Sequence, residues 1–187
     1  MLFEKKDKKI YFVHIPRTGG RMVKALLFSN NFKTNHVYGE YKGVENLHLH
    51  CELLKDIKEY TDNLKFTIMR NPYRRLRSIL SMIRKHNTER DLEKLLNSLA
   101  NKNFNNWLMP QSNFIDKECK VWKYEKGFKQ DFINWLNDNF NLNVVYHKVG
   151  YKIFDYDNYF LLDQTTDMNK LTEKLYKKDI ELYETIK

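Results

Sequence analysis

Apolar residues gather in two short runs, and each run is followed at once by a turn and then by apolar residues at helical spacing. The first run, Lys9 to Ile15 (KIYFVHI), is rich in β-branched and aromatic residues and stops at Pro16, which predicts a buried strand. After Thr18-Gly19-Gly20, the segment Arg21 to Ser29 has apolar residues three and four positions apart, which predicts a helix. The predicted order is therefore strand, glycine loop, helix.

A second copy of this arrangement begins at Lys65. The run Lys65 to Met69 (KFTIM) predicts another buried strand, and Arg70-Asn71-Pro72 predicts the turn that follows. Pro72 suits the first turn of a helix because its missing N–H would have no partner there. The apolar positions of the predicted helix recur at three and four residues: Leu76, Ile79, Leu80 and Ile83.

The other predicted elements follow from the same two periodicities. Strands that alternate with helices indicate an α/β fold with a parallel sheet flanked by helices, and such sheets bind ligands at the carboxyl ends of their strands, where both turns lie. Neither a repeat nor a linker is evident, so we expect residues 1–187 to form a single domain. The further elements are helices at Leu47 to Tyr60, Asp91 to Ala100, Phe128 to Asn137 and Lys170 to Ile186, and strands at Lys120 to Lys123 and Val144 to His147.

Composition excludes several classes of protein. Hydrophobic residues make up 42% of the 187 positions, enough for a core, and no apolar run approaches the roughly 18 residues of a membrane span. The charged start, Met1 to Lys9, does not resemble a signal peptide. Cys51 and Cys119 form neither a disulfide framework nor a C-x-x-C zinc pattern. We therefore expect no membrane span and a cytoplasmic location.

The formal charge of +9 predicts an anionic partner, and the arginines narrow the choice. A guanidinium is a planar fork that suits bidentate binding of phosphate, so arginines gathered in two windows favour two oxyanion sites over a diffuse basic surface. Arg84 and Arg90 also fit a solvated helix face. The eight arginines are Arg17 and Arg21, followed by Arg70, Arg74, Arg75, Arg77, Arg84 and Arg90.

The first turn suits an anion. Glycines at positions 19 and 20 allow backbone N–H groups to face a ligand at a helix N-terminus, although an ordinary strand-to-helix turn has the same pattern. The Walker A pattern cannot be aligned with this loop. The string FVHIPRTGG resembles the 5′-phosphosulfate loop I-P-K-T-G-G-T of carbohydrate-directed sulfotransferases that use 3′-phosphoadenosine 5′-phosphosulfate. Arg17 stands where that family has its catalytic lysine, and Arg21 where it commonly has Thr or Ser.

The second turn carries the other signature of this family. The string RNPYRRLRS, from Arg70 to Ser78, resembles the R-D-P-x-x-R-L-x-S motif, in which Arg70 and Ser78 would correspond to the pair that binds the 3′-phosphate. Asn71 replaces the usual Asp. Later segments are similar to the same branch of the family: Pro110-Gln111-Ser112, Val121 to Glu125 and Tyr176 to Tyr183.

The string His48-Leu49-His50 resembles the H-x-H of uronosyl 2-O-sulfotransferases, in which a histidine is the catalytic base. An ordinary imidazole, with a pKa near 6.5, accepts a proton at neutral pH. Of the two residues, we favour His50 over His48 as the base. The two could instead be surface residues, or with Cys51 grip a metal, but no further ligand cluster is evident and we expect none. His14 and His147 are interpreted as structural.

The resemblance implies a P-loop-like nucleotide-binding fold and a sulfotransferase. The donor would be 3′-phosphoadenosine 5′-phosphosulfate, leaving as 3′,5′-diphosphoadenosine, and the acceptor a hydroxyl, expected to be that of a carbohydrate. Arg17 would stabilise the leaving phosphate together with the backbone of Thr18, Gly19 and Gly20. Residues proposed to line a sugar groove, which could equally be packing residues, are Tyr38, Tyr41, Lys42, Gln111 and the segment Tyr151 to Tyr159.

Two other classes of function stay open. The first is a nucleotide-binding module without turnover, which the arginines at positions 17 and 21 would allow. The second is a basic nucleic-acid-binding protein, suggested by the charge and the many aromatic residues. The aromatic residues follow core-like patterns and no nucleic-acid motif is recognisable, so no nucleic-acid partner is expected.

Overall fold

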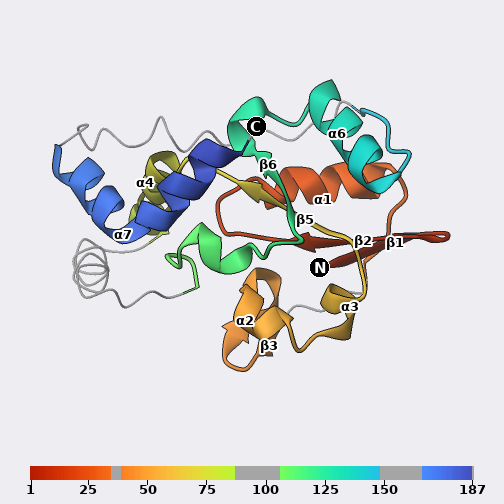
Figure 1. The fold of residues 1–187 in the computed structure, drawn as a ribbon, viewed down its shortest axis with the longest axis horizontal. Helices are drawn as coiled ribbons and strands as arrows, with labels where there is room; N and C mark the ends of the chain where they lie inside the picture. The colour runs from red at the N-terminus through yellow and green to blue at the C-terminus, as the bar shows by residue number, and fades with distance from the viewer. Residues whose placement is uncertain (35–38, 87–105, 148–165, 187) are drawn as a thin grey trace.

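The computed structural model describes residues 1–34, 39–86, 106–147 and 166–186. A four-stranded sheet has the order β1-β2-β5-β6, with β1 (Leu2–Lys5) antiparallel to β2 (Lys8–Val13). β5 (Lys65–Met69) is parallel both to β2 and to β6 (Lys120–Lys123). The predicted α/β fold with helices flanking the sheet is therefore confirmed, and the predicted parallel sheet is mostly parallel, with β1 as its antiparallel strand (Figure 1).

Alternating side chains give the sheet two buried faces. Ile10 and Phe12 of β2 belong to a core shared with α1 (Gly20–Ser29) and α6 (Gln130–Phe140). Tyr11 belongs to a second core on the opposite face. Successive residues of a strand point to opposite sides, so one strand contributes to both cores.

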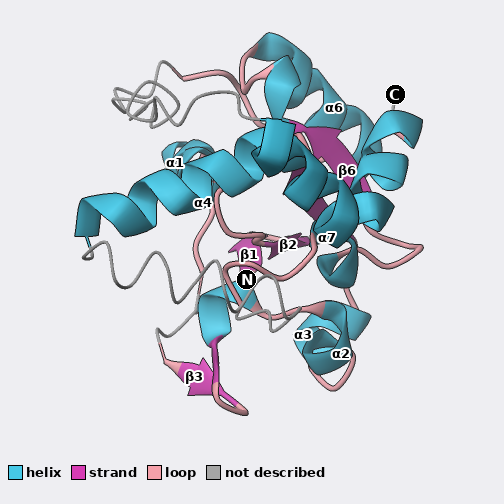
Figure 2. Cartoon of the chain, turned by 90° about the vertical axis from the view of Figure 1, so that its left-hand side faces the viewer, coloured by secondary structure: helices cyan, strands magenta, loops and turns pink. Residues whose placement is uncertain are grey.

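The second core is covered by the short helices α2 (Cys51–Leu54) and α3 (Lys58–Thr61). These helices lie below the sheet in Figure 1 and again in Figure 2, which is turned about the vertical axis. The segment before α2 holds β3 (Glu40–Tyr41) paired with β4 (Val44–Glu45), followed by the 3-10 helix η1 (Asn46–His48).

A third apolar cluster joins α4 (Pro72–His86) to α7 (Thr166–Thr185). Leu76, Ile79 and Leu80 of α4 pack with Leu175 and Tyr176 of α7, as the sequence periodicity of α4 predicts. Between these helices in the chain lie η2 (Gln111–Phe114) and η3 (Tyr124–Lys126), on either side of β6. Among the described residues, no helix is both long enough and apolar enough to cross a membrane.

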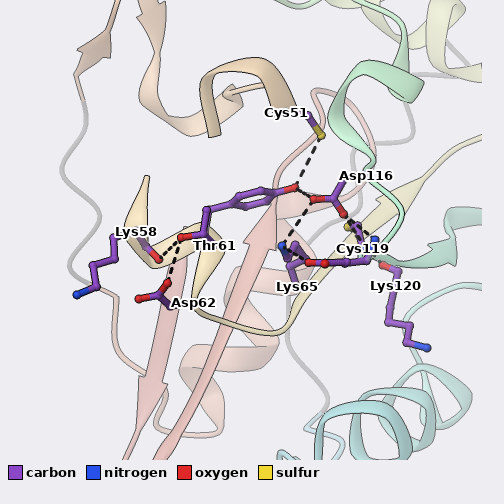
Figure 3. Close-up of polar contacts among 10 residues, drawn as sticks. Cys51, Lys58, Thr61, Asp62, Lys65, Asp116, Cys119 and Lys120 are labelled. Atoms are coloured by element: carbon purple, nitrogen blue, oxygen red, sulfur yellow. Dashed lines mark hydrogen bonds and ion pairs between the residues drawn. The ribbon is translucent and has the colours of Figure 1, made fainter. Parts of the chain in front are cut away.

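The predicted helix from Leu47 to Tyr60 is wrong, because extended residues separate η1 from α2 and a turn separates α2 from α3. Its buried apolar residues are Leu49, Leu54 and Tyr60, whose spacings of five and six do not match one helix face. Tyr60 is fixed by tertiary contacts: its hydroxyl donates to Asp116, and the Lys65 ammonium lies 4.2 Å from its ring centroid. Figure 3 shows this polar cluster between α3 and the loop before β6.

The predicted strand from Val144 to His147 is also wrong. Side-chain amides take the place of a neighbouring strand. The amide of Asn137 bonds both the N–H and the C=O of Val144, each at 2.9 Å. Asn30 does the same for Val145, at 2.8 and 3.0 Å. Backbone groups satisfied in this way need no sheet partner.

The remaining elements include one strand that was not predicted and two helices that were. The strand β1 was not predicted, because its two-residue connection to β2, Lys6-Asp7, lacks the usual Asn-Gly or Asp-Gly signal even though Lys6 has a φ of 54°. The predicted helix from Asp91 to Ala100 lies outside the described residues. The helices predicted at 128–137 and 170–186 correspond to α6 and α7.

Candidate functional site

The two arginine-bearing turns lie side by side at one edge of the sheet. β2 and β5 are parallel neighbours with Val13 opposite Thr67, so both strands end at the same edge. The Thr67 hydroxyl donates to the Val13 carbonyl at 2.6 Å, which ties the strand ends together. The sheet topology therefore brings positions 17 and 70 close together although they are far apart in the sequence.

Arg17 contacts the second motif directly. Its Nε and Nη2 atoms donate to the Ser78 hydroxyl at 3.0 and 2.8 Å, and Ser78 is buried on α4. Arg17 has a φ of 66°, an uncommon value for a residue with a Cβ, which directs the start of the loop toward α4. Two residues predicted to bind opposite ends of one ligand are thus hydrogen-bonded to each other.

The glycine loop is closely packed from both sides. Gly19 has a φ of 90°, and a Cβ there would lie 2.6 Å from Cζ of Phe128. A Cβ on Gly20 would lie 1.9 Å from Nε2 of His14, so neither position accepts a side chain without rearrangement. The buried Thr18 hydroxyl donates to the Ile15 carbonyl at 2.8 Å. Thr18 therefore offers a ligand its backbone and not its hydroxyl.

Helix α1 begins at Gly20 with neither a side-chain cap nor an acidic residue in its first turn. The first N–H groups of a helix have no partner within the helix, and the helix dipole favours negative charge there. Arg21, in the same first turn, is exposed. The start of α1 thus has the features that suit an anion, and the predicted loop residues lie together there.

Arg70 lies behind the same loop. Its guanidinium donates to the Arg17 carbonyl at 3.3 Å and stacks 4.6 Å from the ring centroid of Tyr124. The Tyr124 ring is also 3.1 Å from the position of a Cβ on Gly19. Tyr124 therefore contacts both turns, a role that its sequence position did not indicate.

The backbone of Arg70 is held by one side chain. Gln111 of η2 accepts the Arg70 N–H through Oε1 at 3.0 Å and donates to the Arg70 carbonyl through Nε2 at 2.8 Å. Gln111 is fully buried, so the prediction that it lines an open sugar groove is wrong. A side-chain amide that makes both bonds replaces the backbone partners that a residue just beyond the end of a strand lacks.

Arg75, assigned no role from the sequence, is buried at the base of the site. Its guanidinium donates to the carbonyls of Pro16, Met109 and Trp107 at 3.0, 3.0 and 2.9 Å. Burial lowers the pKa of Arg75 from its usual value, while Tyr176 and Asp179 raise it. One signal was available, because Arg75 precedes Ile79 by four residues and so belongs to the buried stripe of α4.

Asn71, which replaces the family's Asp, has a clear structural role. Its Oδ1 atom accepts the N–H groups of Tyr73 and Arg74 at 3.1 and 3.2 Å, which caps α4. Its own N–H donates to Glu125 at 2.9 Å, and Glu125 also accepts the Tyr183 hydroxyl at 2.8 Å. The three later segments that resemble the family thus meet around the second turn.

The two candidate bases differ in their surroundings. His48 is buried, its Nδ1 lies 3.0 Å from the His14 carbonyl, and its ring centroid is 4.5 Å from that of His14. His50 is half-buried, and its ring meets that of Phe114 of η2 at 6.4 Å. Burial lowers the pKa of each histidine below 6.5, so both are neutral at pH 7. His50 is the more accessible of the two.

Apart from Gln111, the residues predicted to bind a sugar divide into three groups. Tyr41 lines a cavity of about 550 Å³ with Tyr11, Asn46 and Leu49, along β1 and β2 and away from the carboxyl ends of the strands. Lys42 pairs with Asp56 at 2.8 Å on the surface. Tyr38 and residues 151–159 lie outside the described residues. The cavity is therefore separate from the two turns.

Within the described part of the chain, no group of three or more His, Cys, Asp or Glu residues could hold a metal ion. No protein-family model, curated protein or solved structure matches this chain.

Proposed function

We propose that this protein is a sulfotransferase, which moves a sulfuryl group from 3′-phosphoadenosine 5′-phosphosulfate to a hydroxyl, and that its sheet edge is a P-loop-like nucleotide site. The observation that carries the proposal is the contact of Arg17 with Ser78. It joins the two turns that the sequence resemblance assigns to the two phosphate ends of one nucleotide. Two anion-binding turns with that separation in sequence and this proximity in space suit a ligand with two phosphate groups.

The charges at this edge support an anionic ligand. The guanidinium of Arg17, that of Arg70 and the start of α1 all contribute positive potential at the ends of β2 and β5. The Tyr124 ring beside the loop offers an apolar surface for a planar base. Together these groups match the phosphates and the base of an adenine nucleotide.

The proposed chemistry is an in-line transfer in which the donor supplies the activated sulfuryl group. The S–O bond to the leaving phosphate breaks as the acceptor oxygen bonds to sulfur. Arg17 and the amides of residues 18–20 stabilise the charge that grows on the leaving phosphate. That phosphate is a weak base and needs no proton, so a guanidinium, which does not donate a proton readily, serves as well as an ammonium. His50 accepts the proton of the acceptor hydroxyl.

The direct test measures binding and turnover separately. Calorimetry with adenosine 3′,5′-bisphosphate, which is the leaving product 3′,5′-diphosphoadenosine, tests the nucleotide site. Transfer from sulfur-labelled donor to a panel of glycans tests the reaction. We expect saturable binding and labelled product from at least one glycan. A protein that neither binds the bisphosphate nor labels an acceptor would falsify the proposal.

One observation favours a second function, a nucleotide-binding module without turnover. Arg17 is engaged through two nitrogens with Ser78 and stands where the family has a lysine. Such a module binds the bisphosphate but labels no acceptor, and replacement of His50 does not change its affinity. The same two measurements therefore separate the two functions.

Replacement of His50 by glutamine is expected to slow transfer about 10²-fold at pH 7, because general-base catalysis contributes at least that much. Burial lowers the pKa of His50 below 6.5, so the wild-type kcat/KM should be flat at neutral pH and fall once the pH drops below that lowered pKa. The acid limb should vanish in His50→Gln. The pH profiles of both proteins, with His147→Gln as the control, check this. An unchanged acid limb in His50→Gln excludes the residue as the base.

A further inference from the structure

We infer that Asp179 and Gln111 form a positioning relay that sets the place of Arg70 and, through it, the preference for nucleotides with a 3′-phosphate. This inference rests on the proposed function, because the sequence resemblance assigns Arg70 to that phosphate. It adds two residues that do not touch the nucleotide in the proposed site, and one of them lies on the helix farthest along the chain.

The first link of the relay is the Gln111 amide. A single side chain bonds both the N–H and the C=O of Arg70, at 3.0 and 2.8 Å. These two bonds fix the backbone at the point where β5 ends and the side chain of Arg70 turns toward the Arg17 carbonyl. Because Gln111 is fully buried, water cannot replace either bond.

The second link is the Asp179 carboxylate. Its Oδ2 accepts the backbone N–H of Gln111 at 2.7 Å, and its Oδ1 accepts that of Ser112 at 2.8 Å. Asp179 has no exposed surface, and a buried carboxylate is costly unless its oxygens are hydrogen-bonded. Both oxygens are engaged by the start of η2, so the carboxylate holds η2, and hence the Gln111 amide, against the end of β5.

Another buried hydrogen bond of α7 reaches the segment before η2 but is not part of the relay. One turn earlier on α7, the Tyr176 hydroxyl donates to the Leu108 carbonyl at 2.7 Å and so joins the same helix to the same segment. That bond is made to Leu108 and not to Gln111, the residue that bonds Arg70. Tyr176→Phe therefore removes a buried hydrogen bond of α7 without breaking the relay, and it is the matched control.

The inference predicts a loss of selectivity rather than a general loss of binding. Asp179→Asn keeps the size of the side chain but presents an N–H₂ group to one of the two backbone donors. We expect the Kd for adenosine 3′,5′-bisphosphate to rise about tenfold, since hydrogen bonds to a charged group are among the stronger ones in proteins. The Kd for adenosine 5′-monophosphate, which lacks the 3′-phosphate, should stay within about twofold because Asp179 bonds η2 and not the glycine loop.

The experiment measures both dissociation constants by calorimetry for the wild type, Asp179→Asn, Gln111→Met and Tyr176→Phe. Gln111→Met keeps the side-chain length and removes both bonds to Arg70, so it should reproduce the selective loss and serves if Asp179→Asn fails to fold. Tyr176→Phe should leave the ratio of the two constants unchanged. An unchanged ratio in a folded relay variant, or an equal loss in Tyr176→Phe, overturns the relay alone. A wild-type protein with no preference for the 3′-phosphate overturns both this inference and the proposed function.

Discussion

Replacement of Arg75 by methionine is expected to lower the free energy of unfolding by roughly 3 kcal/mol. The guanidinium donates to the carbonyls of Pro16, Met109 and Trp107, and each of these acceptors loses its partner in the variant. The side chain is fully buried, so water does not take its place. The loss is partly offset because the variant no longer has to bury a cation, a cost visible in the lowered pKa of Arg75.

Urea denaturation followed by circular dichroism measures this change. Arg74→Met is the matched control, because Arg74 is the preceding residue of the same helix and is exposed. That variant should stay within about 0.5 kcal/mol of the wild type. Equal losses in the two variants would show that charge on α4, and not the three carbonyl contacts of Arg75, determines the effect.

Replacement of Arg17 by alanine is expected to reduce the rate of sulfuryl transfer by about 10³-fold. The guanidinium lies at the start of the glycine loop, where the proposed reaction develops negative charge on the leaving phosphate. An interaction that strengthens in the transition state affects the rate more than it affects ground-state binding. The Kd for adenosine 3′,5′-bisphosphate should therefore rise by only about tenfold.

Single-turnover transfer from labelled donor, measured beside calorimetry, separates the two effects. Arg17→Lys is the matched comparison, because an ammonium supplies the same charge without the planar fork of the guanidinium. We expect that variant to transfer sulfate within about tenfold of the wild-type rate. If Arg17→Ala retains the wild-type rate, the guanidinium does not stabilise the leaving group. A wild-type protein that binds the bisphosphate but transfers no sulfate would instead favour the module without turnover.

The strands and turns of the candidate site were predictable because their signals are local. Buried runs such as KFTIM identify parallel strands, Pro72 identifies a helix start, and adjacent glycines identify a loop that must approach its neighbours closely. The failed predictions, by contrast, depend on distant partners. The stretch 47–60 breaks into short helices because Tyr60 is fixed by Asp116 and Lys65.

By itself, the sequence determined the parallel strands of the sheet and the order of strand, loop and helix at each turn, since these follow from short periodic patterns. The candidate residues at positions 17, 70 and 78 came from its resemblance to two family motifs. Only the tertiary structure decided that Arg17 meets Ser78, that Arg75 ties three carbonyls together, and that Asp179 reaches Arg70 through Gln111. These contacts join segments that are distant in sequence. A buried polar residue requires a hydrogen-bond partner, but the residues next to it in the sequence do not indicate which distant residue that partner is.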